Sequence, residues 1–465
     1  MRVARTTRAT RAACASRALR TRCARAAPRA AMAQAAAPPP LVDPSSLASA
    51  AASGAFELRV AHAEYALAPD FGSGTIEGYA ALTLARADGD DGSVERTLYL
   101  DTRELAVASV DVLDDVGAAV APAVHELGDP TPALGALLTV SVPAGAERVG
   151  VRYTTSTTCS AVQFLTPTQT AGGEHPYLFS QCQAIHARSL VVCQDCPAIK
   201  STFSAVVFAP PPLVAVMGAT ALEASSGEAR AAEALARARL GGGVKGDARA
   251  FAFEQRVPIP SYLTALAVGN LECREIGPRS VVWSEPEMVD AGAYEFAETE
   301  DFLAAGEAVA GPYVWGRYDL LLLPPSFPYG GMENPQLTFV TPTLIAGDRS
   351  LSNVVAHEVA HSWTGNLVGC RSWENFWLNE GFTVFLERKI LARARGDPSL
   401  FDFKALGGWD DLKATVATIG AEHNYTRLVP DLSDGNDPDD AFSRIPCVAL
   451  RGAARSRLRP RSSRR

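Results

Sequence analysis

Two histidines four residues apart, with a glutamate directly after the first, are the residues of this sequence best suited to chemistry. They lie in the segment His357-Glu358-Val359-Ala360-His361. On a helix, residues four apart face the same side, so both imidazoles can bind one zinc ion. Glu358 stands beside them and can take a proton from water at the metal. The pattern arises by chance in roughly one chain in a hundred of this length, so other ligands must support it.

A third ligand for such a metal stands further along the chain. Glu380 follows His361 after eighteen residues, which is enough for a turn and the start of a second helix. A catalytic zinc site has three protein ligands and keeps one position open for water. The sequence therefore predicts one zinc ion bound by His357, His361 and Glu380.

Two other segments carry polar side chains that suit a ligand. Residues 328–334 contain two adjacent glycines, which let the backbone approach a ligand closely, and then Glu333, whose carboxylate can pair with a cation. An ordinary glycine turn with a solvated glutamate fits the spacing at least as well. Gln181 and Gln183 lie in an otherwise apolar stretch. They fit either a polar group satisfied in the core or the lining of a cleft.

The composition is that of a globular chain long enough for two or three domains. It has 465 residues, of which 47% are hydrophobic and 20% charged, and a formal net charge of −8. No apolar run is long enough for a membrane span, and an acidic body without a basic patch argues against nucleic acid. Nine cysteines without a secretory signal predict reduced thiols, and the lone pair Cys193 and Cys196 is interpreted as structural or incidental.

The two ends differ from the middle. Residues 1–40 hold nine arginines and no acidic residue, which is typical of an organellar transit peptide, although Met32 is an alternative start. The expected location is therefore the cytoplasm, or a chloroplast or mitochondrion if this leader is genuine. Residues 451–465 contain seven arginines, a composition too polar and repulsive to pack.

Hydrophobic periodicity divides the rest of the chain. Residues 55–210 predict strands of an antiparallel β domain, because apolar residues recur at every second position. The positions that share one face are Ile76, Ala80, Leu82 and Leu84, then Leu138, Val140 and Val142, and then Val149, Val151 and Tyr153. Residues 223–248 indicate a surface insertion that is part helix and part flexible loop.

A mixed α/β domain is expected to begin at about residue 272. Its predicted elements are helices around 291–310 and 409–419, a strand at 320–323, and the helix of the two zinc histidines. We expect Asp348 or Ser350 to cap that helix and Gly365 to lie near its end.

Four segments together resemble the gluzincin zinc aminopeptidases, in the branch of leukotriene A-four hydrolase and aminopeptidase B. They are Pro328-Tyr-Gly-Gly-Met-Glu-Asn-Pro335, Leu351-Ser-Asn-Val354, His357 to Leu367, and Phe376-Trp-Leu-Asn-Glu-Gly381. The resemblance runs from about residue 41 to Pro446.

The resemblance implies an α+β multidomain fold. An N-terminal antiparallel β-saddle domain would cover residues 41–272, with the insertion near 223–248. A thermolysin-like mixed α/β zinc peptidase domain would cover residues 273–446 and be incomplete, and the C-terminal helical domain of the family would be missing. Residues 1–40 and 447–465 would lie outside the family's domains as a leader and an arginine-rich tail.

The resemblance also implies roles for individual residues. His357, His361 and Glu380 would bind one zinc ion, and Glu358 would be the general base. The implied substrate-binding residues are Glu333, which would hold the free α-amine, its neighbours Tyr329, Gly330, Gly331 and Met332, Gln183 in the cleft, and Asp439, which matches an acidic residue tied to N-terminal arginine preference. Glu387 would be the outer hydrogen-bond partner of a zinc histidine.

The implied function is a monomeric zinc aminopeptidase that acts on peptides with a free N-terminus, with epoxide hydrolysis as a side activity. A zinc endopeptidase is disfavoured by Glu333. A departure supports a further alternative, because Cys447 stands where the family has a tyrosine that donates to the oxyanion, and a thiol is a weak donor. The alternative is a truncated, catalytically impaired scaffold that retains the zinc site.

Overall fold

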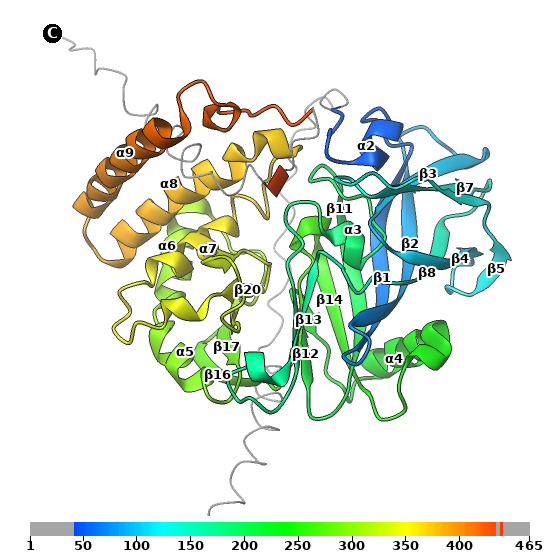
Figure 1. Cartoon of the computed structure of the whole chain (residues 1–465), viewed down its shortest axis with the longest axis horizontal. Helices are drawn as coiled ribbons and strands as arrows, with labels where there is room; N and C mark the ends of the chain where they lie inside the picture. Colours follow the sequence, from blue (N-terminus) through cyan, green and yellow to red (C-terminus); the bar gives the residue numbers. More distant parts are fainter. Residues whose placement is uncertain (1–40, 434–437, 440–465) are drawn as a thin grey trace, which may run out of the picture.

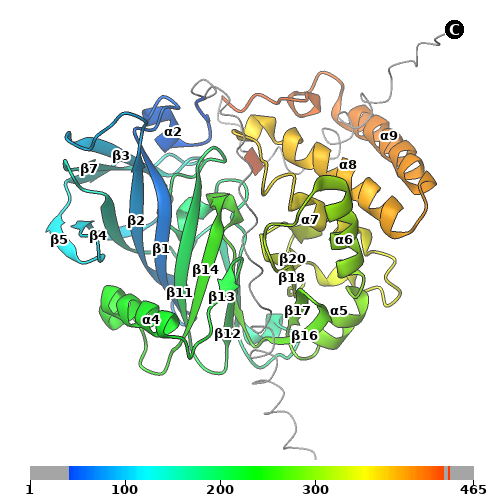
Figure 2. The same ribbon diagram turned by 180° about the vertical axis from the view of Figure 1, so that it is seen from behind.

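The computed structural model of this chain describes residues 41–433 and 438–439. Two halves lie side by side, one built mainly of strands and the other mainly of helices, as Figure 1 shows and Figure 2 repeats from behind. The strands up to Gly269 form three sheets, and those from Glu272 onward form a separate five-stranded sheet. The α+β fold class predicted from the sequence is confirmed.

The largest sheet has eight strands and forms the body of the first half. Its spatial order is β13 (Thr220–Ala221), β14 (Arg249–Pro260), β11 (Lys200–Ala209), β1 (Leu58–Asp70), β2 (Thr75–Arg86), β8 (Arg148–Thr154), β4 (Ala106–Leu113) and β5 (Ala119–Pro122). The period-two prediction is confirmed, because Ile76, Ala80 and Leu82 of β2 are fully buried in the same apolar cluster as Val149 and Val151 of β8.

One pair of strands departs from the antiparallel arrangement that the sequence predicts for this domain. β1 runs parallel to β11, whereas every other neighbouring pair of this sheet is antiparallel. Parallel neighbours need a long crossover connection. Here the connection contains all the strands from β2 onward that precede β11, so no local pattern in the sequence reveals it.

Two smaller sheets complete the first half. The four-stranded sheet has the order β12 (Val214–Met217), β15 (Leu266–Gly269), β10 (Tyr177–Ser180), β9 (Val162–Leu165), and the three-stranded sheet the order β3 (Arg96–Thr102), β7 (Ala136–Val142), β6 (His125–Leu127). β7 alternates regularly between buried and half-buried residues, so one of its faces covers the core. Two short helices, α2 (Leu47–Ala51) and α3 (Ala187–Leu190), lie in this half.

The insertion predicted near residues 223–248 contains a helix, α4 (Gly227–Leu240), that covers one face of the large sheet (Figure 2). Ala236 and Leu240 pack against Tyr79 and Phe208 of the sheet in one buried cluster. The helix begins where the Ser226 hydroxyl accepts a hydrogen bond from a backbone N–H, at 3.0 Å. The centre of β2 is therefore buried on both faces.

The second half surrounds a five-stranded sheet. Its order is β16 (Glu272–Gly277), β17 (Ser280–Ser284), β18 (Asp319–Leu322), β20 (Leu337–Val340) and β19 (Gly331–Met332), so the two-residue strand β19 lies at the edge. The helices are α5 (Val289–Glu295), α6 (Thr299–Ala310), α7 (Asn353–His361), α8 (Trp377–Ala394) and α9 (Ser399–Ile419). Short 3₁₀ turns occur at Pro167–Gln169, Gly241–Gly243, Ser261–Leu263, Pro342–Leu344, Trp373–Asn375 and Asn424–Thr426.

Two local predictions in the second half need correction. α9 ends at Ile419 as expected but begins at Ser399, ten residues before the predicted start. Neither Asp348 nor Ser350 caps α7. Asp348 accepts a hydrogen bond from the Ser350 N–H in a local turn, and Ser352, next to the helix, already has helical dihedrals and no capping bond. The chain turns once more before α7, which leaves both predicted caps too far upstream.

The six cysteines that lie among the described residues follow the prediction with one exception. Cys159, Cys182, Cys193, Cys196 and Cys370 are free and buried. Cys273 is disulfide-bonded, so the prediction of reduced thiols is wrong there. Within residues 41–433 and 438–439, no helix has the length and apolar composition needed to cross a membrane.

The largest apolar core continues from one half into the other. It joins residues of the three β sheets to Trp315, Phe327, Phe339 and Trp373 of the second half. Phe179 meets Phe327 edge to face at 6.0 Å between ring centroids, and Tyr262 meets Trp373 in the same way at 5.0 Å. A second core lies entirely in the helical half and packs α6, α7 and α8 on the five-stranded sheet.

Candidate active site

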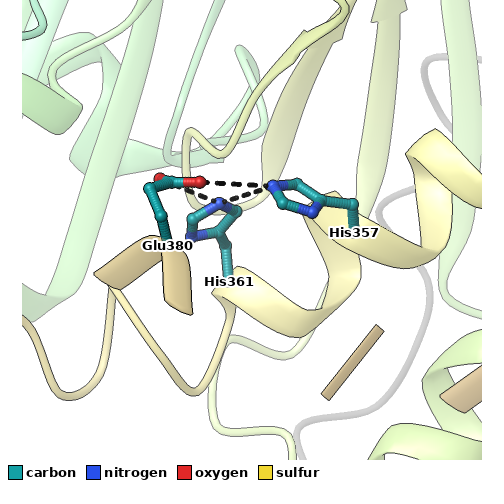
Figure 3. Close-up of side chains that lie close together, drawn as sticks. All are labelled: His357, His361 and Glu380. Carbon is teal, nitrogen blue, oxygen red and sulfur yellow. Dashed lines mark hydrogen bonds and ion pairs between the residues drawn. The ribbon is translucent and has the colours of Figure 1, made fainter. Parts of the chain in front are cut away.

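Three side chains from two helices converge where the two halves meet. His357 and His361 lie one turn apart on α7, and Glu380 lies in the first turn of α8 (Figure 3). The two Nε2 atoms are 3.2 Å apart. The Glu380 oxygens lie 3.5 Å from each Nε2, Oε2 from His357 and Oε1 from His361. The helical spacing predicted from the sequence therefore brings the three side chains together.

These distances fit one zinc ion. Zinc binds imidazole nitrogen and carboxylate oxygen at about 2.0–2.2 Å in tetrahedral geometry, which places ligand atoms roughly 3.3 Å from one another. The three atom pairs lie at 3.2, 3.5 and 3.5 Å. Without a cation, the facing nitrogens and the carboxylate would present lone pairs to one another, so the donor set is suited to a shared metal.

The outer nitrogen of each histidine meets an acceptor. His357 Nδ1 lies 3.2 Å from Glu387 Oε2, and His361 Nδ1 lies 2.9 Å from the backbone oxygen of Thr364. Such partners fix the tautomer that leaves Nε2 free for a metal. The Thr383 hydroxyl lies 3.1 Å from His361 Nδ1 and donates to the same Thr364 oxygen.

The sequence revealed one of these outer partners and missed two. Glu387 follows Glu380 by seven residues, which places both on one face of α8. Thr383 is three residues after Glu380 and shares that face, so the same rule could have found it. Thr364 acts through its backbone oxygen, and residue type carries no signal for such a role.

Glu358 is buried with a free oxygen. Its side chain belongs to α7, and Oε2 has no hydrogen-bond partner among the described residues. Burial raises the pKa of Glu358 to about 7, although His357 and His361 lower it in part. A Cβ at Gly331 would overlap this carboxylate, so only glycine permits the close approach of β19.

Glu333 lies directly after β19 and is also buried. Its Oε1 accepts a hydrogen bond from Gln183 Nε2 of the first half at 3.2 Å. Burial raises the pKa of Glu333 to about 8, and the nearby Glu380 adds to the effect. Ligand atoms of Glu333, Glu358 and His361 all lie within 4.8 Å of one another. A buried pair of carboxylates thus borders the predicted metal position.

The remaining predicted residues lie around this pair. Met332 is buried in β19 and its sulfur accepts from Gln181 Nε2 at 3.2 Å, whereas Tyr329 is largely exposed. The nearest atom to a Cβ on Gly330 would be a methyl carbon 3.8 Å away, so this glycine is not required by packing.

Asp439 contacts the strand-rich half next to Gln183. It accepts a hydrogen bond from the Ala184 N–H at 3.1 Å and lies 2.6 Å from His186 Nε2. Burial raises the pKa of Asp439, but the hydrogen bond and charge of His186, the Ala184 N–H and the charge of Arg103 together outweigh it, so the net shift is downward. Cys447, which departs from the family pattern, lies outside the described residues.

Comparison with known families matches both halves of the chain. The Peptidase M1 N-terminal domain matches residues 61–263. The Peptidase family M1 domain matches residues 294–448 and includes all three predicted metal ligands.

Individual relatives agree with the family match. Leukotriene A-4 hydrolase of Xenopus laevis is 46% identical over 411 residues, which is 87% of this chain and 62% of the relative. Leucine aminopeptidase 2 of Aspergillus terreus is 47% identical over 355 residues, which is 75% of this chain and 54% of the relative. The chain thus spans between about half and three fifths of the length of these relatives.

A solved structure also matches the fold. The structure of yeast LTA4 hydrolase in complex with bestatin superimposes with a TM-score of 0.76 at 36% identity, covering 90% of this chain and 61% of the other. The arrangement of the two halves is therefore shared with a known enzyme.

Proposed function

The chain belongs to peptidase family M1, and on that premise we propose that it is a zinc-dependent aminopeptidase that removes N-terminal residues from peptides. The observation that carries the proposal is the buried Glu333 carboxylate, which lies within 4.8 Å of ligand atoms of Glu358 and His361. A fixed anion so close to the metal position suits a substrate ammonium group one residue away from the bond to be cut. The same boundaries as before, residues 41–272 and 273–446, are proposed for the two domains.

His357, His361 and Glu380 are the proposed zinc ligands. Bound there, zinc would polarise the scissile carbonyl and lower the pKa of water toward about 7. Glu387 and the Thr364 carbonyl accept from the outer nitrogens of the two histidines and so favour the tautomer whose inner nitrogen can bind zinc.

Glu358 is the proposed general base. Its free, buried oxygen beside the proposed zinc ligands suits a group that first accepts a proton from water and then gives it to the leaving amine. The Glu358 carboxylate lies where a side chain at residue 331 would be, because an added Cβ there would overlap it. Positioning of the base therefore depends on the edge strand as well as on α7.

Glu333 and Gln183 are the proposed anchor for the free N-terminus. Gln183 holds one oxygen of Glu333, so the carboxylate cannot rotate freely toward solvent. An ammonium group would relieve the cost of burying two neighbouring carboxylates, whereas a blocked N-terminus would leave them uncompensated. Tyr329, Gly330, Gly331 and Met332 would line the same wall, and β19 presents its unpaired edge to a peptide backbone. Asp439, beside Gln183, is proposed to favour a cationic first side chain.

The test compares free and N-terminally acetylated versions of the same arginyl and alanyl peptides, with and without a chelator. We expect cleavage of free peptides only, abolished by the chelator and restored by zinc. Glu333→Gln should lower kcat/KM for free peptides by roughly 10²-fold, since one charge-assisted buried hydrogen bond is lost. Cleavage of the acetylated peptides would contradict the proposal and favour an endopeptidase.

Two alternatives rest on specific observations. The relative named leukotriene A-4 hydrolase extends the proposal to epoxide hydrolysis as a second activity, tested by product formation from that epoxide. The replacement of the family's tyrosine by Cys447 favours a scaffold that binds zinc but turns over poorly, because loss of one oxyanion donor typically lowers kcat by ~10²–10³. Zinc binding without cleavage of any peptide would select the scaffold.

A further inference from the structure

The loop between α7 and α8 contacts both a proposed metal ligand, His361, and the proposed amine anchor, Glu333. The Thr364 oxygen holds His361, and the Asn366 side chain donates to the Glu333 backbone oxygen at 2.7 Å. The loop is tightly wound, because the N–H groups of Gly365 and Val368 bond to oxygens within it or at its start, at 2.8 and 3.1 Å. One short segment, residues 362–370, therefore links the metal ligand to the proposed amine anchor.

Lys200 reaches this loop from the other half of the molecule. It is the first residue of β11, and its Nζ donates to the backbone oxygens of Asn366 and Leu367 at 2.9 and 3.2 Å. Among the described residues, no carboxylate lies within ion-pair distance of this ammonium group. Burial lowers the pKa of Lys200, as expected for a charge that is partly removed from water.

Tyr262 reaches the same loop from a second position in the strand-rich half. Its side chain is 2% exposed, and its hydroxyl lies 3.5 Å from the Gly365 oxygen. Asn379, the residue before Glu380, donates to this hydroxyl at 3.2 Å and accepts from the Cys370 N–H at 2.8 Å. Tyr262 thus connects the loop to the start of α8, where the third proposed metal ligand lies.

We propose that Lys200 and Tyr262 of the strand-rich half are positioning residues of the metal site, which they hold in its geometry through residues 362–370. The proposal rests on the zinc aminopeptidase function above. Lys200 fixes the consecutive backbone carbonyls of Asn366 and Leu367, and the Asn366 side chain in turn fixes the backbone of Glu333. Tyr262 fixes Gly365 and Asn379, the neighbours of Thr364 and Glu380.

The kind of contact argues against a purely stabilising role for Lys200. A partly buried ammonium that bonds only to carbonyls, with no carboxylate to pair with, leaves its desolvation poorly compensated. Within the part of the chain that the structure describes, the hydrogen bonds of the Lys200 ammonium group all go to one loop of the site. The chain offers a contrast in Lys245, which is 69% exposed and pairs with Asp70 at 2.8 Å.

The test uses the full chain with Lys200→Met and Tyr262→Phe, the latter removing only a hydroxyl. Lys245→Met is the control for the first. Tyr177→Phe is the control for the second, because the buried Tyr177 hydroxyl has no hydrogen-bond partner among the described residues. Zinc affinity is measured by competition with a chromophoric chelator, and amide hydrogen exchange is measured across residues 362–370.

We expect each test variant to weaken zinc binding by roughly 10-fold or more, as other outer partners of metal ligands do. Exchange in the loop should become faster, and the KM of free peptides should rise more in Lys200→Met than kcat falls. Both controls should match the wild type. Unchanged zinc affinity in both test variants overturns the proposal, even if their thermal stability falls.

The result for Lys200 and Tyr262 can be distinguished from the result for the aminopeptidase function. If the wild-type chain binds no zinc, the aminopeptidase proposal fails and the positioning of a metal fails with it. If it binds zinc but cleaves no peptide, only the aminopeptidase function fails, because zinc affinity and loop exchange still decide the role of Lys200 and Tyr262.

Discussion

Two regions border the same site: the helix pair α7–α8, and the wall formed by β19 and its neighbour Glu333. Their polar groups differ in how many hydrogen-bond partners the protein gives them. On the helices, the outer nitrogens of His357 and His361 meet protein acceptors at 3.2 and 2.9 Å. In the wall, Glu333 has one side-chain partner in Gln183, and the facing Glu358 leaves one buried oxygen with none among the described residues.

The comparison shows which polar groups of the site have partners within the protein and which are left for a bound ligand to satisfy. A buried polar atom without a partner is destabilising unless something else binds it. Burial raises the pKa of Glu333 to about 8 and that of Glu358 to about 7, because the protein alone supports their charges poorly. The chain holds the three proposed metal ligands in place, whereas it gives the two carboxylates few partners of its own among the described residues.

The substitution with the largest expected effect should lower catalysis and leave zinc binding unchanged. Glu358→Gln should lower kcat by about 10²–10⁴, the range that general-base catalysis provides, while zinc affinity stays close to that of the wild type. Steady-state kinetics measures the fall in kcat, and chelator titration measures whether zinc is retained. A variant that also loses zinc would show that the two regions do not act separately.

Gly331→Ala tests the contact between the edge strand and the base. An added methyl group would overlap the Glu358 carboxylate and displace it, and a misplacement of about 1 Å can lower the rate about 10²-fold. Gly407→Ala is the control, since a Cβ there meets nothing within 4 Å. If kinetics show wild-type kcat for Gly331→Ala, the base does not depend on β19.

Glu387→Ala tests the helix pair α7–α8, where the outer nitrogens of both histidines already have protein partners. The loss of the acceptor for His357 Nδ1 should weaken zinc binding by roughly 10–100-fold. Glu387→Gln keeps an acceptor without the charge, so an intermediate affinity is expected in the same chelator competition. Equal affinities for both variants and the wild type would mean that α8 contributes only Glu380 to the metal.

Ser226→Ala gives the smallest effect and lies far from both regions. It removes the cap of α4 and should lower the free energy of unfolding by about 1 kcal/mol, with zinc affinity and kcat unchanged. Urea denaturation measures the loss. A fall in zinc affinity here would show that general stability, rather than local contacts, controls the site.

The parts predicted from the sequence are those that local geometry determines. The spacing of His357, His361, Glu380 and Glu387 follows from helical periodicity, so the structure brings them together as expected. The period of two in β2, β7 and β8 follows in the same way from the pleat of a strand. Family membership was also accessible, because the motifs around Glu333 and Glu380 are specific.

The parts that were missed depend on contacts between distant segments. Lys200 and Tyr262 reach the loop across more than 100 positions of sequence, and the parallel pairing of β1 with β11 spans a similar distance. The caps of α7 were misplaced because a turn precedes the helix, and its geometry depends on contacts such as that of Ser352 with Glu298. No single-residue propensity contains this information.

The apolar core shared by the two halves has a consequence for how the molecule moves. Interfaces that allow hinge motion within a chain are small and relatively polar, whereas here buried aromatic rings such as Phe179, Phe327, Tyr262 and Trp373 interlock across the boundary. The halves should therefore unfold in one cooperative transition. The wall and the helix pair should also keep a fixed separation, so the site is preformed and a ligand bound there would not have to close it.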